Sequence, residues 1–325
     1  IEIGEEKTMS LFTTPAALGV TEEEIDSPTG TYGVPEFGTN FVRQMLVDTK
    51  PKTFSELIRI SGLSHGTDVW TGNAQELIRN KVTNLSGAIC TRDDIMLYLI
   101  SMNLEPKHAF FIMEAVRKGK GLKPEDEEEM RAHNVPEWYI ESCNKIQYMF
   151  PKAHAVAYVT MAFRIAWFKV YYPKEYYTTY FSIRAGDFDY ELMCQGREKV
   201  LHTMKELDQK KEQEKLSAKE NGMYTVLQMC NEMYCRKIRF LPISLYESDA
   251  TKFMVREDGI LPPLNSISGL GDNAAQSICE ERQKKEFFSK DEILERTKLT
   301  KTNLEVLERC GCLAGMSQSS QMSLF

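Results

Sequence analysis

The spacing of apolar residues along the chain predicts a protein built mainly from α-helices. Apolar residues recur every three to four positions in several stretches, which is the repeat of a helix with one buried face. We expect such helices at 40–59, 74–80, 93–104, 107–121 and 150–169. Thr21, followed by three glutamates, predicts a capped helix start, and the charged run 207–222 predicts a solvated helix or its end.

Stretches without this repeat mark the connections. Residues 61–73 are polar and hold three glycines, which predicts a loop. Beyond about Cys235, the β-prone residues 252–255 and the turn residues 257–259 predict a small hairpin, followed by short helices. Residues 1–30 are rich in turn residues, and we expect them to continue from a larger preceding part.

The net charge of −7 is unevenly distributed. Residues 1–30 carry −6 and residues 121–130 carry −4, so the remaining 285 residues sum to +3. No acidic residue lies between Glu141 and Glu175, where five cations occur: Lys145, Lys152, Arg164, Lys169 and Lys174. Salt screens charges beyond about 8–10 Å, so this stretch creates a local positive field unless acidic neighbours from elsewhere pack against it.

Composition excludes several classes of protein. The eight cysteines have no zinc-ribbon spacing, so we expect free thiols in a reducing cytosol and no metal site. No run approaches the roughly 18 apolar residues of a membrane span, and the first residues hold no apolar signal region. We therefore expect a cytoplasmic protein.

The stretch 150–169 sets cations and aromatic rings among apolar residues. On a helix, His154, Tyr158 and Met161 share one face, while Ala157 and Arg164 lie on another. Small residues let a large ligand approach, and cations bind phosphate oxygens. The alternative is a buried aromatic helix with a hydrogen-bonded histidine.

The sequence FPKAHAVAYVTMAFRIAWFKVYYP at 150–173 resembles the fingers helix of C-family bacterial replicative DNA polymerases. The positions of that family's fingers-helix motif are occupied here by Lys152, His154, Tyr158, Lys169 and Tyr172-Pro173. SGLSHGTDVWTGNAQELI, TRDDIMLYLI and MEAVRKGKGL narrow the resemblance to the Gram-positive, PolC-class DNA polymerase III alpha subunits, across essentially the whole chain. The resemblance implies the C-terminal portion of a longer enzyme.

The resemblance implies three regions: a helical fingers domain at 1–235, with 1–30 arriving from the palm; a small α+β duplex-binding region at 236–315; and a flexible clamp-binding tail at 316–325. The whole enzyme would add deoxynucleotides to a primer 3′ end and release pyrophosphate. Its Mg²⁺ ligands would be palm carboxylates outside this chain, which alone would be inactive. Implied partners are primer-template DNA, incoming dNTP, the sliding clamp and other replisome subunits.

The resemblance also implies which residues grip the incoming nucleotide, since phosphoryl transfer depends on positioning and charge neutralisation. They are Lys152, His154, Tyr158, Arg164, Ser64, His65, Gly66, Arg92, Lys118 and Lys120. For the turn at 117–120, the alternative is a helix C-terminus with favourable dipole charges. Asp187 and Asp189 have the spacing of a metal-binding pair, but the family places its catalytic aspartates in the palm, so we expect no metal there.

Residues 267–271, ISGLG, followed by a helical AAQSI, have the form of a helix-hairpin-helix, and 299–312 form a degenerate second copy. The glycines permit a turn that offers backbone N–H groups to a DNA phosphate. Candidate DNA-binding residues are Gly269, Gly271, Asn273, Lys284, Lys285 and Lys301. The alternative is a plain helical hairpin.

The last residues match the Gln-x-x-Leu-Phe peptide by which bacterial polymerases bind the sliding clamp. The matching residues are Gln321, Met322, Leu324 and Phe325, whereas the similar MSLF at 9–12 lacks the glutamine and is expected in the core. Two rival functions remain open: a non-catalytic helix-hairpin-helix adaptor recruited to the clamp, and a metal-dependent nuclease using Asp187 and Asp189.

Overall fold

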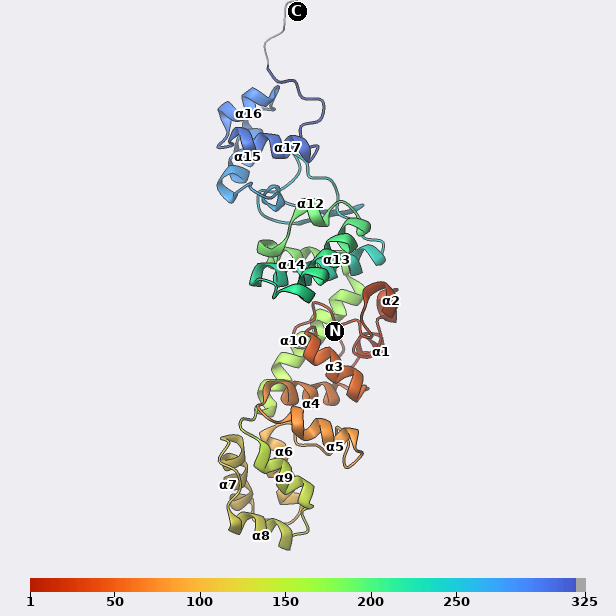
Figure 1. Ribbon diagram of the computed structural model, residues 1–325, viewed down its shortest axis with the longest axis vertical. Coiled ribbons are helices and arrows are strands. Elements are labelled where there is room, and N and C mark those ends of the chain that lie inside the picture. Colours follow the sequence, from red (N-terminus) through yellow and green to blue (C-terminus); the bar gives the residue numbers. More distant parts are fainter. Residues whose placement is uncertain (320–325) are drawn as a thin grey trace, which may run out of the picture. The chain divides into compact units, whose positions relative to one another are not determined.

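The computed structural model describes residues 1–319, which form two compact, mainly helical units (Figure 1). Unit 1 comprises Ile1–Leu18 and Ser27–Val170, and unit 2 comprises Gly19–Asp26 and the residues from Tyr171 onward. The prediction of a mainly helical fold is confirmed. None of the helices within residues 1–319 is long and apolar enough to cross a membrane.

Unit 1 consists of short helices and most of one long helix. Its helices are α1 (Glu6–Ser10), α3 (Asn40–Thr49), α4 (Phe54–His65), α5 (Gln75–Arg79), α6 (Arg92–Ser101), α7 (Pro106–Arg117), α8 (Pro124–Ala132), α9 (Glu137–Lys145) and most of α10 (Lys152–Tyr171), with short turns η1 (Ala16–Leu18) and η2 (Trp70–Ala74). In Figure 1, α6 to α9 lie together at one end of α10, and α1 and α3 lie beside its middle.

Unit 2 combines helices with one small hairpin. Its elements are α2 (Glu22–Ile25), α11 (Pro173–Ile183), η3 (Ala185–Asp187), α12 (Tyr190–Met193), α13 (Arg197–Gln213), α14 (Ala218–Cys235), β1 (Met254–Arg256), β2 (Gly259–Leu261), η4 (Leu264–Ser266), α15 (Asp272–Lys284), α16 (Lys290–Arg296) and α17 (Lys301–Arg309). The predicted hairpin is confirmed: β1 and β2 pair antiparallel, with Val255 opposite Ile260.

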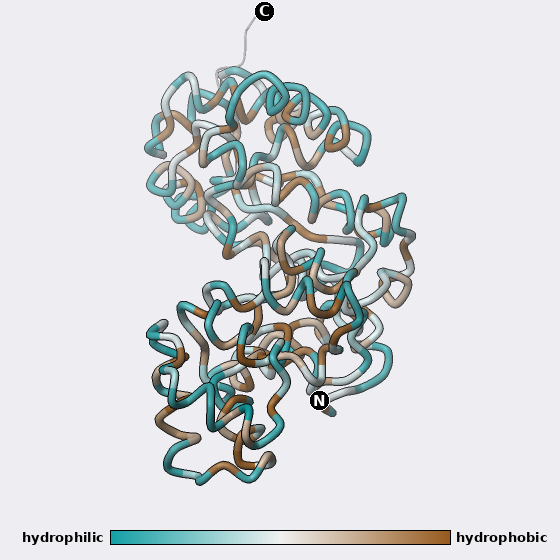
Figure 2. The backbone as a smooth tube through the Cα atoms, turned by 60° about the horizontal axis from the view of Figure 1, so that its bottom comes forward, coloured by the Kyte–Doolittle hydropathy of each residue, from teal (hydrophilic) through white to brown (hydrophobic). Residues whose placement is uncertain are grey.

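Side-chain caps explain where several helices begin. Thr21, Thr53 and Ser217 each accept a hydrogen bond from the N–H three residues on, and the glutamate at that position bonds back to the cap. The predicted cap at Thr21 is therefore confirmed. Figure 2 shows the alternation of hydrophilic and hydrophobic positions that the helices then follow.

The buried face of α10 carries the core of unit 1. Phe163 stacks on Phe12 at 6.4 Å between ring centroids and meets Phe54 edge-on at 5.7 Å. Met9, Leu11 and Phe12 are buried, so the prediction that the first MSLF lies in the core is confirmed. Lys169 is also fully buried, and its Nζ donates hydrogen bonds to the carbonyls of Gly30 and Tyr32.

Two local predictions are wrong. Residues 61–65 are not a loop but the last turns of α4, because Ser61, Gly62 and Leu63 pack inside the unit. The stretch predicted as one helix at 40–59 is two helices, since Lys50 adopts a left-handed conformation (φ 45°) and Thr53 caps a new start.

Candidate nucleotide and DNA interface

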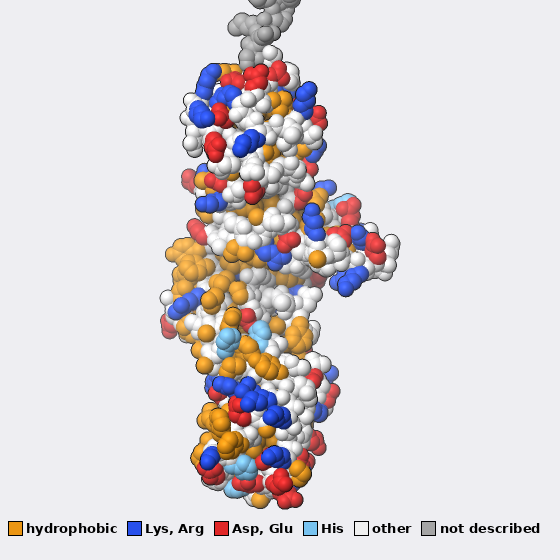
Figure 3. All heavy atoms as spheres, turned by 90° about the vertical axis from the view of Figure 1, so that its left-hand side faces the viewer, with side chains coloured by type: hydrophobic (Ala, Val, Ile, Leu, Met, Phe, Trp, Pro, Cys, Tyr) orange, Lys and Arg blue, Asp and Glu red, His pale blue; other side chains and the backbone are white. Residues whose placement is uncertain are grey.

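α10 presents the predicted residues on its exposed side. The exposed side chains are Lys152, His154, Tyr158, Met161 and Arg164, whereas Ala155, Val159, Ala162, Phe163 and Ala166 are buried. Tyr158 is 45% exposed, so its ring is not part of the core formed by the described residues. Figure 3 shows histidine side chains among hydrophobic ones on one face, with Lys and Arg side chains beside them.

The connection from α9 into α10 joins three other segments through backbone hydrogen bonds. The N–H of Thr67, just beyond α4, donates to the carbonyl of Tyr148 at 2.9 Å. The N–H of Met149 donates to the carbonyl of Arg117 at 3.4 Å. The N–H of Arg92 donates to the carbonyl of Phe150 at 3.2 Å.

These bonds bring predicted residues from distant parts of the sequence to the start of α10. The end of α4 brings His65 and Gly66, the turn after α7 carries Lys118 and Lys120, and α6 begins at Arg92. Ser64 lies on the same turn of α4, but its hydroxyl donates to the carbonyl of Ser61 in its own helix.

A row of rings connects α4 to the exposed side of α10. His65 stacks on Phe150 at 5.1 Å, Phe150 meets His154 edge-on at 4.6 Å, and His154 contacts Tyr158 at 4.6 Å between ring centroids. The row therefore fixes both histidines through one phenylalanine.

The stretch 142–174 has no acidic residue of its own, but carboxylates from other segments contact this region. Glu36 forms an ion pair with Nε2 of His65. Asp93 accepts a hydrogen bond from the N–H of Lys152 at 2.7 Å and caps the start of α10. Within residues 1–319, no carboxylate pairs with the side chains of Lys152, His154 or Arg164.

The turn after α7 mixes paired and exposed cations. Glu114 binds Arg117 at 2.7 Å and Lys118 at 3.0 Å, and these hydrogen bonds, that of Arg117 first, lower the pKa of Glu114 to about 2. Lys120 is exposed, and no carboxylate in the described part of the chain pairs with it. The turn thus offers Lys120 more readily than Lys118 to an outside anion.

In unit 2, two similar turns meet. Gly269 and Gly271 precede α15, and a Cβ added at either glycine would meet no atom within 4 Å. Asn303, near the start of α17, donates from Nδ2 to the carbonyl of Gly269 at 2.8 Å. Leu270 and Leu299, at matching positions of the two turns, are both buried.

The structure places the predicted DNA-binding residues at two separate ends. Asn273 and Lys301 are exposed near the paired turns, as is Lys298. Lys284 and Lys285 lie at the other end of α15, about 20 Å along the helix axis from Gly271. Lys284 pairs with Glu281 at 2.6 Å and Lys285 with Glu292 at 3.8 Å.

Asp187 and Asp189 have structural partners. Asp187 accepts from Arg184 at 2.8 Å, and Asp189 caps α12 by accepting from the N–H of Leu192. Neither residue lies in a strand. Among residues 1–319, no three His, Cys, Asp or Glu side chains gather as metal ligands.

The cysteines are free thiols. Burial raises the pKa of the Cys90 and Cys312 thiols to about 12. Such thiols stay protonated at neutral pH and are poor nucleophiles.

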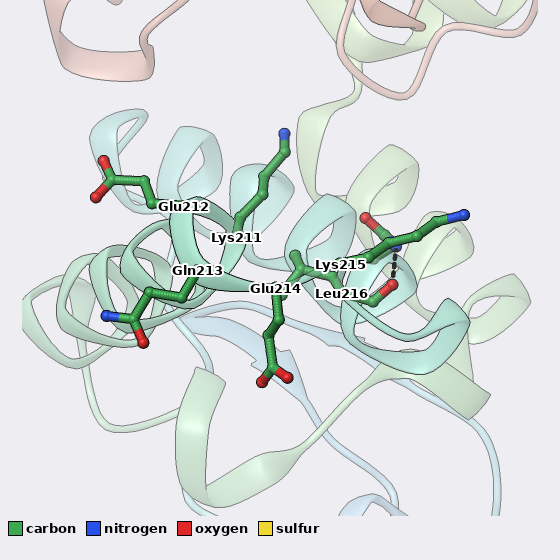
Figure 4. Close-up of a pocket in the computed structure, with 7 residues that line it drawn as sticks. Lys211, Glu212, Gln213, Glu214, Lys215 and Leu216 are labelled. Atoms are coloured by element: carbon green, nitrogen blue, oxygen red, sulfur yellow. Dashed lines mark hydrogen bonds between the residues drawn. The ribbon is translucent and has the colours of Figure 1, made fainter.

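One hollow in the described part of the chain is lined by none of the predicted residues. The hollow in Figure 4 is lined by the end of α13, the connection after it and Asn221, whose side chain donates to the carbonyl of Leu216. Its lysine and glutamate side chains point in different directions around the opening.

The predicted clamp-binding residues Gln321, Met322, Leu324 and Phe325 lie outside the described residues.

The sequence did not single out Phe150, which links the rings of His65 and His154, or Glu36, which pairs with His65. Phe150 carried a signal, because it directly precedes Pro151 and Lys152 at the start of the basic stretch. Glu36 lies in a turn-rich segment far from His65 in the sequence, and its contact with that histidine becomes visible only in the structure.

Two protein-family models and several known proteins match this chain. The bacterial DNA polymerase III alpha subunit finger domain family matches residues 1–137, and the helix-hairpin-helix motif family matches residues 237–322. PolC-type DNA polymerase III of Clostridium perfringens is 58% identical over all 325 residues, which cover 22% of that protein. The enzyme of Bacillus subtilis is 54% identical over 319 residues, 98% of this chain and 22% of the relative.

The PolC-type DNA polymerase III of Caldanaerobacter subterraneus is 53% identical over the whole chain. The chain spans less than a quarter of the length of these relatives, because it covers 22–23% of each. The chain therefore belongs to the PolC-type DNA polymerase III family, as the portion that contains the finger domain and the helix-hairpin-helix motif.

Proposed function

We propose that this chain grips the incoming deoxynucleotide and the primer-template duplex while the full polymerase extends a primer 3′ end and releases pyrophosphate. The observation that carries the nucleotide site is the convergence at the start of α10. There, backbone hydrogen bonds join the end of α4, the turn after α7 and the start of α6. Cations near one helix start suit a triphosphate.

Within this site, Lys152, Arg92 and Lys120 are proposed to neutralise the phosphates, and Tyr158 to lie against the base. Arg164, three turns along α10, is proposed to contact the same nucleotide. Mg²⁺, which the family implies for the reaction, would be held by carboxylates outside this chain. Asp187 and Asp189 do not fit as its ligands, since Arg184 and the start of α12 already engage them.

The nucleotide site is tested in the full polymerase by measuring the Kd for incoming dNTP on a primer-template. We expect Lys152→Ala and Arg164→Ala each to weaken binding about 10-fold or more, because each removes a charge-assisted contact worth about 1.5–3 kcal/mol. Lys205→Ala, an exposed lysine on α13, is the matched control. Unchanged affinity in both site variants would refute the assignment.

The duplex site is proposed at the paired turns of unit 2. Open space in front of Gly269 and Gly271 lets a phosphate approach the backbone, and Lys298 and Lys301 lie next to it. Gly271→Ala meets no protein atom, so it should fold normally yet weaken duplex binding several-fold. Lys301→Ala should reduce the slope of log K for duplex binding against log salt concentration by about one. Lys284→Ala, at the far end of α15, should change this slope less.

The tail at 321–325 is proposed to bind the sliding clamp. Ending the chain after Ser320 should abolish retention on immobilised clamp while leaving duplex affinity intact. Retention of the shortened chain would remove this part of the proposal.

A further inference from the structure

The contact between Glu36 and His65 points to chemistry beyond holding a nucleotide. Glu36 contacts Nε2 of His65, and its side chain is 15% exposed against 38% for the histidine. Glu36 has a φ of 70°, which few residues other than glycine adopt and which costs energy. Seven other non-glycine residues in the described part of the chain also have a positive φ, so this angle by itself does not mark a functional site.

This arrangement leaves Nδ1 as the nitrogen of His65 that can exchange a proton with a ligand. Within residues 1–319, no protein group is hydrogen-bonded to Nδ1. A carboxylate on one imidazole nitrogen orients the ring and stabilises the imidazolium form, while the other nitrogen gives or takes the proton. Phe150 stacks on the ring at 5.1 Å with 28° between planes and restricts its rotation.

His65 lies at the phosphate-binding end of the proposed nucleotide site. It directly precedes Gly66 and Thr67, and Thr67 bridges to Tyr148 beside the start of α10. The elements joined there carry these other titratable or charged groups: Asp68, Arg92, Asp93, Glu114, Arg117, Lys118, Lys120, Tyr148, Lys152 and His154. Lysine and arginine side chains outnumber the carboxylates among them, five to three, which favours the triphosphate tail here rather than the base or sugar.

We propose that His65 is the general acid that protonates the leaving pyrophosphate, with Glu36 and Phe150 as positioning residues. The proposal rests on the nucleotide site proposed above. As the primer 3′-oxygen bonds to the α-phosphorus, the bond from that phosphorus to the bridging oxygen breaks. The bridging oxygen leaves with pyrophosphate and takes the proton from Nδ1. The 3′-hydroxyl proton goes to water, from which the imidazole regains its own.

The test is the single-turnover insertion rate of the full polymerase at saturating dNTP, measured from pH 6 to pH 10. His65→Gln should lower the rate about 100-fold or more, the usual contribution of a general acid, and should abolish its fall at high pH. Glu36→Gln should lower the saturated rate without weakening dNTP binding, because the imidazole ring loses the carboxylate that orients it. Phe150→Leu should lower the single-turnover rate without changing the pH at which this rate falls.

His202→Gln is the matched control, since His202 also pairs with a glutamate, Glu206 at 3.5 Å, but on the exposed surface of α13. A His65→Gln enzyme that binds dNTP weakly yet keeps the wild-type saturated rate and pH profile would overturn the general-acid role. Unchanged dNTP affinity in Lys152→Ala and Arg164→Ala would instead remove the nucleotide site itself. The two failures are therefore distinguishable.

Discussion

Gly119 is the residue on which the basic turn after α7 depends. Its φ is 70°, and a Cβ there would lie 2.5 Å from the carbonyl oxygen of Gln147. Gly121 has a similar φ of 68°, but its added Cβ would meet only the Asn144 side chain at 3.4 Å. A substitution at Gly121 therefore introduces backbone strain alone, whereas one at Gly119 introduces strain and a clash with the backbone.

At this scale we expect Gly119→Ala to lower the free energy of unfolding of unit 1 by about 2–4 kcal/mol, through strain and clash together. Gly121→Ala should cost about 1–2 kcal/mol, from strain alone. Urea unfolding followed by tryptophan fluorescence measures this, since Trp70, Trp138 and Trp167 all lie in unit 1. Equal losses in the two variants would contradict the clash.

Among the elements, α7 and α8 are joined by one histidine. His108 on α7 contacts Asp126 at 2.8 Å through Nε2 and Glu129 at 2.5 Å through Nδ1, both on α8. The hydrogen bond to Asp126 and the charge of Glu129 raise the pKa of His108, although partial burial opposes them. His108 thus joins α7 to the acidic face of α8.

The contact between α7 and α8 should make the stability of unit 1 depend on pH. Because the pKa of His108 is raised above its ordinary value of 6.5, its stabilisation is full below pH 6.5 and is lost as the pH rises through the higher folded value. The urea midpoint of unit 1 should therefore fall on going from pH 6 to pH 8.5 more in wild type than in His108→Gln. Parallel pH profiles for the two proteins would show that this contact contributes nothing.

For the whole molecule, the order of the sequence does not match the division into units. Residues Gly19–Asp26 belong to unit 2, although unit 1 flanks them on both sides. Ile25 is buried, and the carbonyl of Glu24 accepts hydrogen bonds from Asn231 at 2.9 Å and Arg197 at 3.1 Å. A short N-terminal segment thus completes a unit formed mainly by residues beyond 170.

We therefore expect Ile25→Ala to destabilise unit 2 and not unit 1. Truncating a buried isoleucine costs about 2–5 kcal/mol, which should appear as faster amide hydrogen exchange in α14. The tryptophan fluorescence transition, which reports on unit 1, should stay in place. A matching shift of that transition would mean that the two units unfold together.

The sequence by itself determined the features that depend on neighbouring residues. The helical repeat placed α6, α7 and α10, the cap at Thr21 marked the start of α2, and the turn residues 257–259 marked the hairpin. The glycines of 267–271 marked the turn before α15. Each signal lies within a few residues, so the local backbone geometry is enough to produce it.

Only the tertiary structure decided which of these elements meet. The bonds from Tyr148, Met149 and Phe150 reach partners between 32 and 81 residues away, and no local period encodes such a pairing. The same holds for the contact of Glu36 with His65 and for the separation of Lys284 from the turn that it was expected to serve. Burial extended α4 to His65 against its polar sequence, because packing against the rest of the unit outweighs local preference.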